Sequence, residues 1–313
     1  YLDVIYRTSN IKKACRNWAK EHVDDEVIVF VYSAINAYIK GALEVRKICK
    51  NCKVLLIITD LPQFMELRPS KLKKRLKDAN WKSLYKSIMS CDGWIPFTKH
   101  MIPYLKLPQE KCIVVEGSVN VNDAIDSIEV AEGNHVIIMY SGGLNLSYGI
   151  PELLNAFNML NDKSYELWFT GKGNAVNLIK ERALEDSRIK YWGFLPTHDD
   201  VINLQQKATM LINTRMPTEK ASAYCFPSKI FDYLLSGKPV LTFEIPGIPD
   251  DYYTYLVKMN SPNSSDIGEA IEYVAKMKSD ERSKLGVAGK NYILIEKNNI
   301  VQSKKIVEFF KLA

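Results

Sequence analysis

The residues best suited to chemistry lie around a proline in the last third of the chain. Pro227 is followed by Ser228, Lys229 and Asp232, and Gly237, with a proline two residues later, closes the segment. A proline suits the first turn of a helix, and a glycine followed by a proline stops one, so a short helix is predicted between them. Ser228 and Asp232 share one face of that helix because they are four residues apart. A hydroxyl, an ammonium and a carboxylate therefore gather at a helix start.

A helix start of this kind can bind an anion. Unpaired N–H groups and a partial positive charge collect there, and Lys229 lies beside them, so phosphate oxygens would be held. Asp232 lies one turn further on, and its two oxygens could accept both hydroxyls of a ribose. The alternative is an amphipathic helix with Ser228 as its cap and solvated charges. The spacing alone fits both interpretations.

The segment resembles a known family. Family 4 (group 1) glycosyltransferases of the GT-B fold, in particular those that build bacterial surface polysaccharides, carry a donor-nucleotide segment similar to Pro-Ser-Lys-Ile-Phe-Asp-Tyr-Leu-Leu-Ser-Gly-Lys-Pro-Val from Pro227 on. The family uses nucleotide-diphosphate sugars, retains the anomeric configuration and needs neither a metal nor another cofactor, because helix dipoles and backbone donors stabilise the leaving diphosphate. The resemblance implies Ser228 and Lys229 on the phosphates, Asp232 on the ribose, and a UDP-linked donor.

Two further segments resemble the donor site of that family. Val136–Leu144 is a predicted strand that ends in Gly142 and Gly143, and glycines let a backbone approach a ligand closely. In the family this register is the loop beneath the donor diphosphate. Gly193 and Phe194 follow a short predicted strand, and the resemblance implies that they hold the nucleobase through main-chain groups. A structural turn is the alternative at that position.

The glycine loop departs from the family pattern. Many members carry an Arg shortly after the first glycine and a Lys before the last, and this chain has Gly143 or Leu144 and Tyr148 at those places. Backbone N–H groups, Lys229 and Lys172 would then neutralise the negative charge of the phosphates.

A second departure concerns an acidic residue. Many members carry a Glu eight residues before the position of Asp232, and this chain has Tyr224 there. Glu219 lies five residues earlier, and its spacing gives no reason to substitute it. Two alternatives to a hexosyltransferase-type enzyme (EC 2.4) therefore stay open: a catalytically silent GT-B scaffold that binds a partner glycosyltransferase, and a nucleotide-sugar epimerase of the same fold.

The predicted helices and strands alternate along the whole chain, which is typical of α/β proteins with parallel sheets and crossover helices. The resemblance implies the GT-B arrangement of two Rossmann-like domains that face a cleft. We expect an N-terminal acceptor-side domain at 1–127, a C-terminal nucleotide-sugar domain at 128–295, and a helix at 296–313 that crosses back to the first domain. About 125 residues precede the linker and lack the family's opening strand and Gly-rich loop, so the N-terminal domain is expected to be incomplete.

Asp60 directly follows Val54–Thr59, a predicted strand in the first half of the chain. Ligands of parallel sheets gather at the carboxyl ends of strands, and in the family such junctions line the acceptor side. Asp60 is therefore the catalytic candidate facing the acceptor, with a capping role as the alternative. A later segment, Cys112–Gly117, is predicted to be the last strand of this domain.

Residues 68–87 combine eight Lys and Arg with leucines, a tryptophan and a tyrosine. A helix of this composition can lie on an anionic membrane surface, and a solvated helix packed on its own domain is the alternative. The glycan or lipid-linked acceptor fits the first interpretation. We expect a cytoplasmic protein, peripheral on the inner face of the membrane.

Composition limits the class of protein. The chain of 313 residues has a net charge of +6 and 47% hydrophobic residues, which is typical of a globular protein with room for two domains. Neither a membrane span, a signal peptide nor a nucleic-acid partner is expected. Six cysteines at irregular positions, with Cys49 and Cys52 as a lone C-x-x-C, predict reduced thiols and no metal site.

Overall fold

The structure is a computed structural model that describes residues 2–61, 71–123 and 135–312. The chain divides into two compact units. Unit 1 comprises Tyr1–Glu116, Ala223–Phe226 and Lys305–Ala313, and unit 2 comprises Gly117–Ser222 and Pro227–Lys304. The predicted linker falls mostly on 124–134, which lie outside the described residues. Residues 68–70 of the basic segment lie outside them too.

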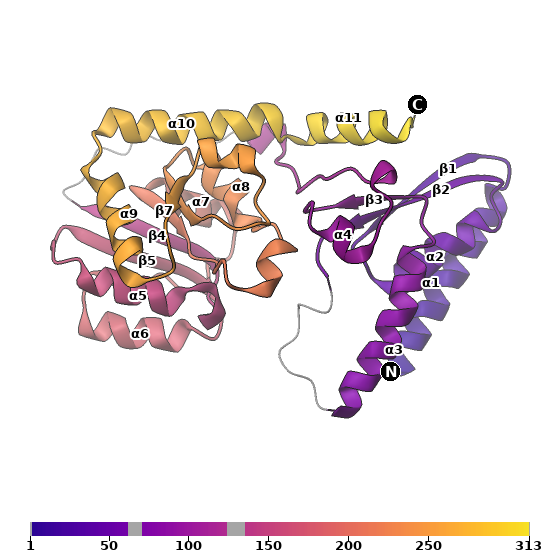
Figure 1. Ribbon diagram of the computed structural model, residues 1–313, viewed down its shortest axis with the longest axis horizontal. Helices are drawn as coiled ribbons and strands as arrows, with labels where there is room; N and C mark the ends of the chain where they lie inside the picture. The colour runs from indigo at the N-terminus through magenta and orange to yellow at the C-terminus, as the bar shows by residue number, and fades with distance from the viewer. Residues whose placement is uncertain (1, 62–70, 124–134, 313) are drawn as a thin grey trace. The chain divides into compact units, whose positions relative to one another are not determined.

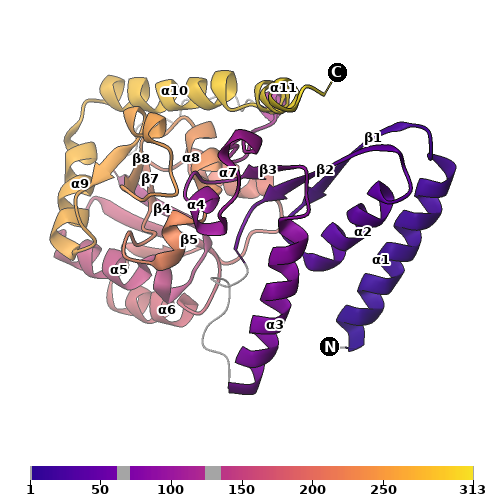
Figure 2. The same ribbon diagram turned by 45° about the vertical axis from the view of Figure 1, so that its right-hand side comes forward.

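Unit 1 contains a three-stranded parallel sheet with the order β1-β2-β3 (Figure 1). Its elements are α1 (Leu2–Glu21), β1 (Glu26–Tyr32), α2 (Asn36–Arg46), β2 (Asn51–Ile58), α3 (Lys71–Ile88), β3 (Gly93–Pro96), α4 (Met101–Leu105) and the 3-10 turn η2 (Gln109–Lys111). Helix α1 packs along α2, as Figure 2 shows. Apolar residues of α2, such as Ile39, join the strand residues Val54 and Leu56 in one core.

The prediction of a strand at Cys112–Gly117 is wrong. The segment is extended beside β3, and Ile113 and Val115 donate backbone hydrogen bonds to the carbonyls of Trp94 and Pro96 at 3.1 Å each. Only one isolated bridge forms, between Trp94 and Cys112. The next parallel bridge would need an N–H from residue 96, and a proline has none. Pro96 therefore stops the ladder after a single step.

Unit 2 contains a six-stranded, all-parallel sheet with the order β6-β5-β4-β7-β8-β9. Its strands are β4 (Val136–Gly143), β5 (Tyr165–Lys172), β6 (Ile189–Tyr191), β7 (Met210–Asn213), β8 (Val240–Phe243) and β9 (Val257–Met259). Its helices are α5 (Ile150–Met159), α6 (Val176–Glu185), α7 (His198–Gln206), α8 (Lys229–Leu235), α9 (Ser264–Lys276) and α10 (Ser279–Glu296), with 3-10 turns η3 (Val121–Asp123), η4 (Leu146–Tyr148), η5 (Lys220–Ala223) and η6 (Asp250–Thr254). Helix α11 (Asn299–Phe310) ends among residues grouped with unit 1.

Helices cover both faces of this sheet. Figure 1 shows α5 and α6 on one side of it, and α8 and α10 on the other. Helix α9 packs against α5, and α10 packs against α8. The contact is close because a Cβ on Gly286 of α10 would lie 1.9 Å from the carbonyl oxygen of Gly237, just after α8. The sheet is therefore a doubly wound, α/β core.

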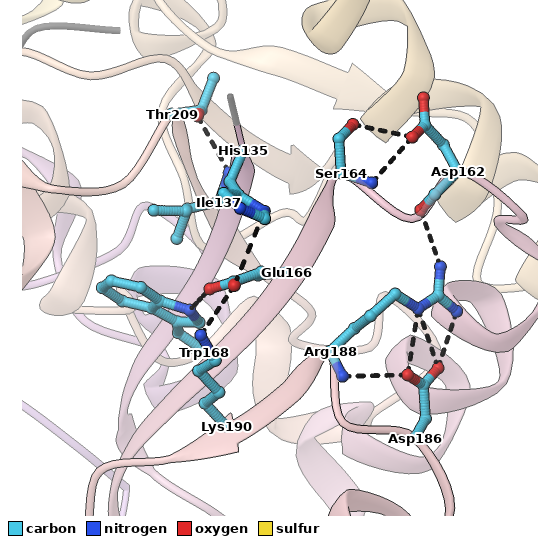
Figure 3. Close-up of polar contacts among 10 residues, drawn as sticks. All are labelled: His135, Ile137, Asp162, Ser164, Glu166, Trp168, Asp186, Arg188, Lys190 and Thr209. Carbon is cyan, nitrogen blue, oxygen red and sulfur yellow. Dashed lines mark hydrogen bonds and ion pairs between the residues drawn. The ribbon is translucent and has the colours of Figure 1, made fainter. Parts of the chain in front are cut away.

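Polar contacts lie on β5, on β6 and in the turn that precedes β6 (Figure 3). The carboxylate of Glu166 accepts hydrogen bonds from the indole of Trp168 and from Lys190, both at 2.7 Å. Arg188 pairs with Asp186 at 2.7 Å. Because Glu166 and Lys190 come from neighbouring strands, their contact holds the register of β5 and β6.

The six cysteines lie among the residues that the structure describes. All six cysteines are free thiols. Burial raises the pKa of Cys91 to about 12 and that of Cys52 to about 11, so both stay protonated near neutral pH. None of the described helices is long and apolar enough to cross a bilayer.

Candidate functional site

The strand order places a switch point between β4 and β7. Chain connections run outward from β4 in one direction and from β7 in the other, and ligands of such sheets bind at the carboxyl ends of the strands at this point. The β4–β7 register ends at the pair Met139 and Leu211. The β4–β5 register continues to Gly143 and Lys172. The end of β4 therefore leaves β7 while it stays paired with β5.

A tyrosine of α8 replaces the strand partner that β4 loses. The N–H of Ser141 donates to the hydroxyl of Tyr233 at 2.8 Å, and that hydroxyl donates to the carbonyl of Ser141 at 3.0 Å. Gln205 of α7 donates to the Ser141 hydroxyl at 2.9 Å. Tyr233 is fully buried. It therefore ties α8 to the residue that immediately precedes the glycines.

The glycines allow the strand ends to approach closely. Gly142 and Gly171 are register partners with φ of 113° and 138°, a region that favours glycine. A Cβ on Gly171 would lie 1.8 Å from the carbonyl oxygen of Gly142. Gly173 is equally constrained, because its Cβ would lie 1.9 Å from the carbonyl oxygen of Leu144. The sequence singled out Gly142 and Gly143, whereas the tighter requirement falls on Gly171 and Gly173.

Lys229 extends from the first residue of α8 to this glycine pair. A Cβ on Gly142 would lie 3.6 Å from its Nζ, and that Nζ lies 3.7 Å from the ring centroid of Tyr140. Part of the stem reaches the surface, but Nζ is buried and has no hydrogen-bond partner within the described chain. A buried amine of this kind lacks an acceptor that an anion would supply.

The surroundings of Lys229 oppose its charge. Burial is the largest cause, the positive charge of Arg215 adds to it, and the carboxylate of Asp232 acts in the opposite direction. Together they lower the pKa of Lys229 from 10.5 to about 7. The ammonium is therefore only weakly favoured near neutral pH, although the Tyr140 ring beneath it favours the charged form.

Arg215 is a site residue that the sequence did not single out. It follows β7, and its guanidinium carbon lies 5.5 Å from the ring centroid of Tyr148. Its Nε lies 3.5 Å from Glu219 and 3.4 Å from the Ser222 hydroxyl. A cation from the loop after β7 therefore lies beside Tyr148. The position of Arg215 after a strand next to the switch point was a signal available in the sequence.

Lys172, Gly193 and Phe194 lie together at the ends of β5 and β6. Lys172 Nζ lies 3.6 Å from the ring centroid of Phe194. The carbonyl of Gly193 accepts the N–H of Gly171 at 2.9 Å and the hydroxyl of Thr170 at 2.8 Å. Phe194 is 58% exposed, and a Cβ on Gly193 would meet nothing within 4 Å. An exposed aromatic ring and an open backbone therefore lie beside the glycine pair.

The start of α8 differs in part from the predicted one. The N–H groups of Ile230 and Phe231 are paired, since they donate to the carbonyls of Pro227 and Ser228 at 2.9 and 3.0 Å. These i to i−3 bonds tighten the first turn. Ser228 is exposed and its side chain makes no capping hydrogen bond. Asp232 lies one turn after Ser228 and is partly exposed.

Asp60 and Tyr224 belong to unit 1, whereas all the other predicted site residues belong to unit 2. Asp60 is partly exposed after β2, beside the buried Thr59. Thr59 donates to the Ser33 hydroxyl at 3.4 Å, and Ser33 has a φ of 72° at the end of β1. The ring of Tyr224 lies 4.7 Å from that of Tyr104. Residues 62–70, which would decide whether Asp60 caps the next element, lie outside the described residues.

The Tyr233 contact leads to a testable expectation. Tyr233→Phe leaves the N–H and the carbonyl of Ser141 without their partner, which is expected to lower the free energy of unfolding by about 1–3 kcal/mol, measured by urea denaturation. Tyr253→Phe is the matched control, because its hydroxyl makes the same pair of bonds to Ile245 away from the glycines, at 2.9 and 3.2 Å. Both variants should lose stability, and only Tyr233→Phe should also weaken nucleotide binding. Equal nucleotide affinity in the two variants would contradict a positioning role of Tyr233.

Among the residues that the structure describes, no group of three or more His, Cys, Asp or Glu side chains could hold a metal ion. Three basic side chains, Lys229, Arg215 and Lys172, lie near the glycine pair, and the carboxylates of Asp232 and Glu219 lie beside two of them. The arrangement suits an anionic ligand with an apolar or aromatic part.

Comparisons with known proteins show which proteins the chain resembles. Residues 135–277 match the family described as Glycosyl transferases group 1. The probable glycosyltransferase WbjE of Pseudomonas aeruginosa is 26% identical over 107 residues, which are 34% of this chain and 26% of that protein. The chain thus spans about a quarter of the length of this curated relative.

Solved structures are similar over nearly the whole chain. A glycosyltransferase from Rickettsia africae has a TM-score of 0.71 at 17% identity, over 99% of this chain and 82% of that one. HepE of Anabaena, in complex with UDP, has a TM-score of 0.72 at 11% identity, over 98% of this chain and 82% of that one. Likeness at these identities shows the fold, which is GT-B, and residues 135–277 are similar to the group 1 glycosyltransferases.

Proposed function

We propose that the protein transfers a sugar from a UDP-linked donor to a surface-glycan or lipid-linked acceptor, with retention and without a metal. The observation that carries the proposal is the buried amine of Lys229, which lies without a hydrogen-bond partner in the described chain beside Gly142. A diphosphate supplies the missing acceptors and the opposite charge. Transfer of the sugar then needs this charge to stabilise the leaving diphosphate.

Each predicted site residue of unit 2 has a role in this proposal. Lys229, with Ser228 and the backbone at Gly142 and Gly143, contacts the phosphates, and Asp232 accepts the ribose hydroxyls. Gly193 and Phe194 hold the base, and Lys172 supports the phosphates from the side of β5. The exposed Phe194 ring and the open space at Gly193 support the place of the base.

The nature of the donor is supported by the structural neighbours. HepE of Anabaena was solved in complex with UDP and with UDP-glucose, and TarM of S. aureus was solved in complex with UDP. We propose the same nucleotide for this chain.

The acceptor side of the proposal rests on the resemblance to surface-polysaccharide enzymes. Asp60, at the carboxyl end of β2, is the proposed catalytic residue facing the acceptor. The basic segment 68–87 would hold the protein on the anionic inner face of a cytoplasmic membrane, where a lipid-linked acceptor lies. Domain limits of 1–127, 128–295 and 296–313 remain part of this proposal.

Calorimetric titration with UDP, GDP and ADP tests the donor site. Saturable binding of UDP, with much weaker binding of GDP and ADP, is the expected result. Binding of GDP or ADP alone would show that the donor carries that nucleotide and not UDP. If none of the three binds, the silent scaffold becomes the better interpretation, for which the Tyr224 and Tyr148 replacements are the specific observations. A separate product assay without acceptor tests the epimerase alternative: conversion of the nucleotide sugar into its epimer would identify an epimerase.

A further inference from the structure

The amine of Lys229 is suited to gain a proton when a ligand arrives. Its Nζ is buried beside Gly142 and has no acceptor among the described residues. An ammonium has three N–H donors, so in the empty site none of them would have a partner. A neutral amine avoids that cost, because an uncompensated buried charge is far less stable than a neutral group.

The charged and titratable groups around Lys229 act on its charge in opposite directions, and burial outweighs them. Arg215 comes from the loop after β7 and repels the ammonium, while Asp232 comes from α8 itself and attracts it. Tyr140 of β4 and Tyr233 of α8 are the phenols at this place, and burial raises the pKa of both well above the neutral range, so they keep their protons. Tyr148 lies beside them, under the guanidinium of Arg215. The pKa of Lys229, lowered by burial to about 7, lets its amine change charge near neutral pH.

We propose that Lys229 makes this site specific for a diphosphate by taking up one proton from solvent as the diphosphate binds against Gly142. This inference rests on the proposed function and adds the proton as a second ligand. The lone pair of Nζ accepts the proton, and the resulting ammonium donates to the phosphate oxygens. A nucleoside without phosphates cannot supply those acceptors and therefore binds without the proton.

The physical consequence is a coupling between donor affinity and pH. The burial that depresses the pKa of Lys229 in the empty site is offset when a diphosphate lies beside it, so the pKa rises in the complex. Above about pH 7 the complex then holds more protons than the empty protein, and affinity for UDP falls as pH rises, by up to about tenfold per pH unit. Above about pH 7 UDP itself is almost fully ionised, since a terminal phosphate has a pKa of about 6. The dependence would therefore belong to the protein.

Calorimetry measures the proton directly. UDP is titrated into the full chain at about pH 8 in Tris and in HEPES, whose ionisation enthalpies differ, and the difference in heat gives the protons taken up. We expect close to one proton per UDP and none per uridine. Phosphate buffer is excluded because it would compete for the same site.

Two variants assign the proton to Lys229. Lys229→Arg keeps the charge at every pH because a guanidinium is not deprotonated in proteins, so UDP binding should lose both its proton uptake and its dependence on pH. Lys229→Met should weaken UDP by about 10–100-fold, as for a lost charged contact, and leave uridine binding unchanged. Lys163→Met is the matched control, because Lys163 is exposed at the opposite end of β5, and it should behave as wild type.

The outcomes separate this inference from the proposed function. UDP binding without proton uptake, or proton uptake that persists in Lys229→Arg, overturns the role of Lys229 and leaves the donor site standing. Failure of the wild-type protein to bind UDP overturns both. Thermal unfolding of each variant checks its fold, and Lys229→Met is expected to fold because it replaces a buried amine by an apolar chain of similar length.

Discussion

Asp232→Ala is expected to weaken UDP binding by about 2–4 kcal/mol, or roughly 30- to 1,000-fold, which calorimetry measures. Two contributions add up. The variant loses the acceptor proposed for the two ribose hydroxyls, and a hydrogen bond to a charged group contributes about 1.5–3 kcal/mol net of solvent. It also removes the negative charge that favours the ammonium of Lys229. The pKa of Lys229 should therefore fall further, and binding should weaken already at lower pH.

A matched control distinguishes the site from general helix electrostatics. Asp280 lies in the first turn of α10 as Asp232 lies in the first turn of α8, and its side chain is 63% exposed with an ion pair to Lys284. Asp280→Ala should leave UDP affinity unchanged. Equal binding by wild type and Asp232→Ala would remove Asp232 from the donor site. A loss in Asp232→Ala that is independent of pH would confine its role to the ribose.

Gly171→Ala is expected to give the largest loss of stability in unit 2, at least about 3 kcal/mol. Its Cβ would lie 1.8 Å from the carbonyl oxygen of Gly142, and its φ of 138° is unfavourable for any residue with a Cβ. The contact involves backbone on both sides, so no rotamer change relieves it. The strand ends of β4 and β5 must separate, which disturbs the glycine pair beneath Lys229. Urea denaturation and UDP titration should both report the change.

Gly193→Ala separates backbone strain from the clash. Gly193 also has a positive φ, 75°, but its Cβ would meet nothing within 4 Å. Only the conformational cost remains, about 1 kcal/mol. If Gly193→Ala destabilised unit 2 as much as Gly171→Ala, the close approach of the two strands would not be the reason for the glycine at 171.

Local patterns predicted most elements of unit 2. The proline and glycine around α8 mark both ends of that helix within two residues of Lys229–Leu235, because these residues act through their own backbone angles. The apolar runs that became β4 and β5 are equally local signals, since a strand buried on both faces needs apolar side chains throughout. The family resemblance and the α/β fold with parallel sheets followed from these segments and are confirmed.

Local patterns failed to predict structure that depends on a residue distant in the sequence. Cys112–Gly117 has strand composition, but its neighbour on the sheet is Pro96, which cannot donate the second hydrogen bond. Arg215 was not predicted as a site residue, because its position beside Tyr148 depends on a turn that spacing does not describe. Tyr233 was not predicted either, because its partner, Ser141, lies 92 positions away in sequence.

The sequence by itself determined which residue types stand at the proposed donor site, because the helix start at Ser228 and the glycines at the end of β4 are encoded by neighbours in the chain. Tertiary structure alone decided the electrostatic state of that site. The pKa of Lys229 depends on burial and on Arg215, which lies 14 positions away in sequence. Gly171 became essential because β5 lies against β4 at that register. Charge and close packing arise between segments, so they appear only once the chain has folded.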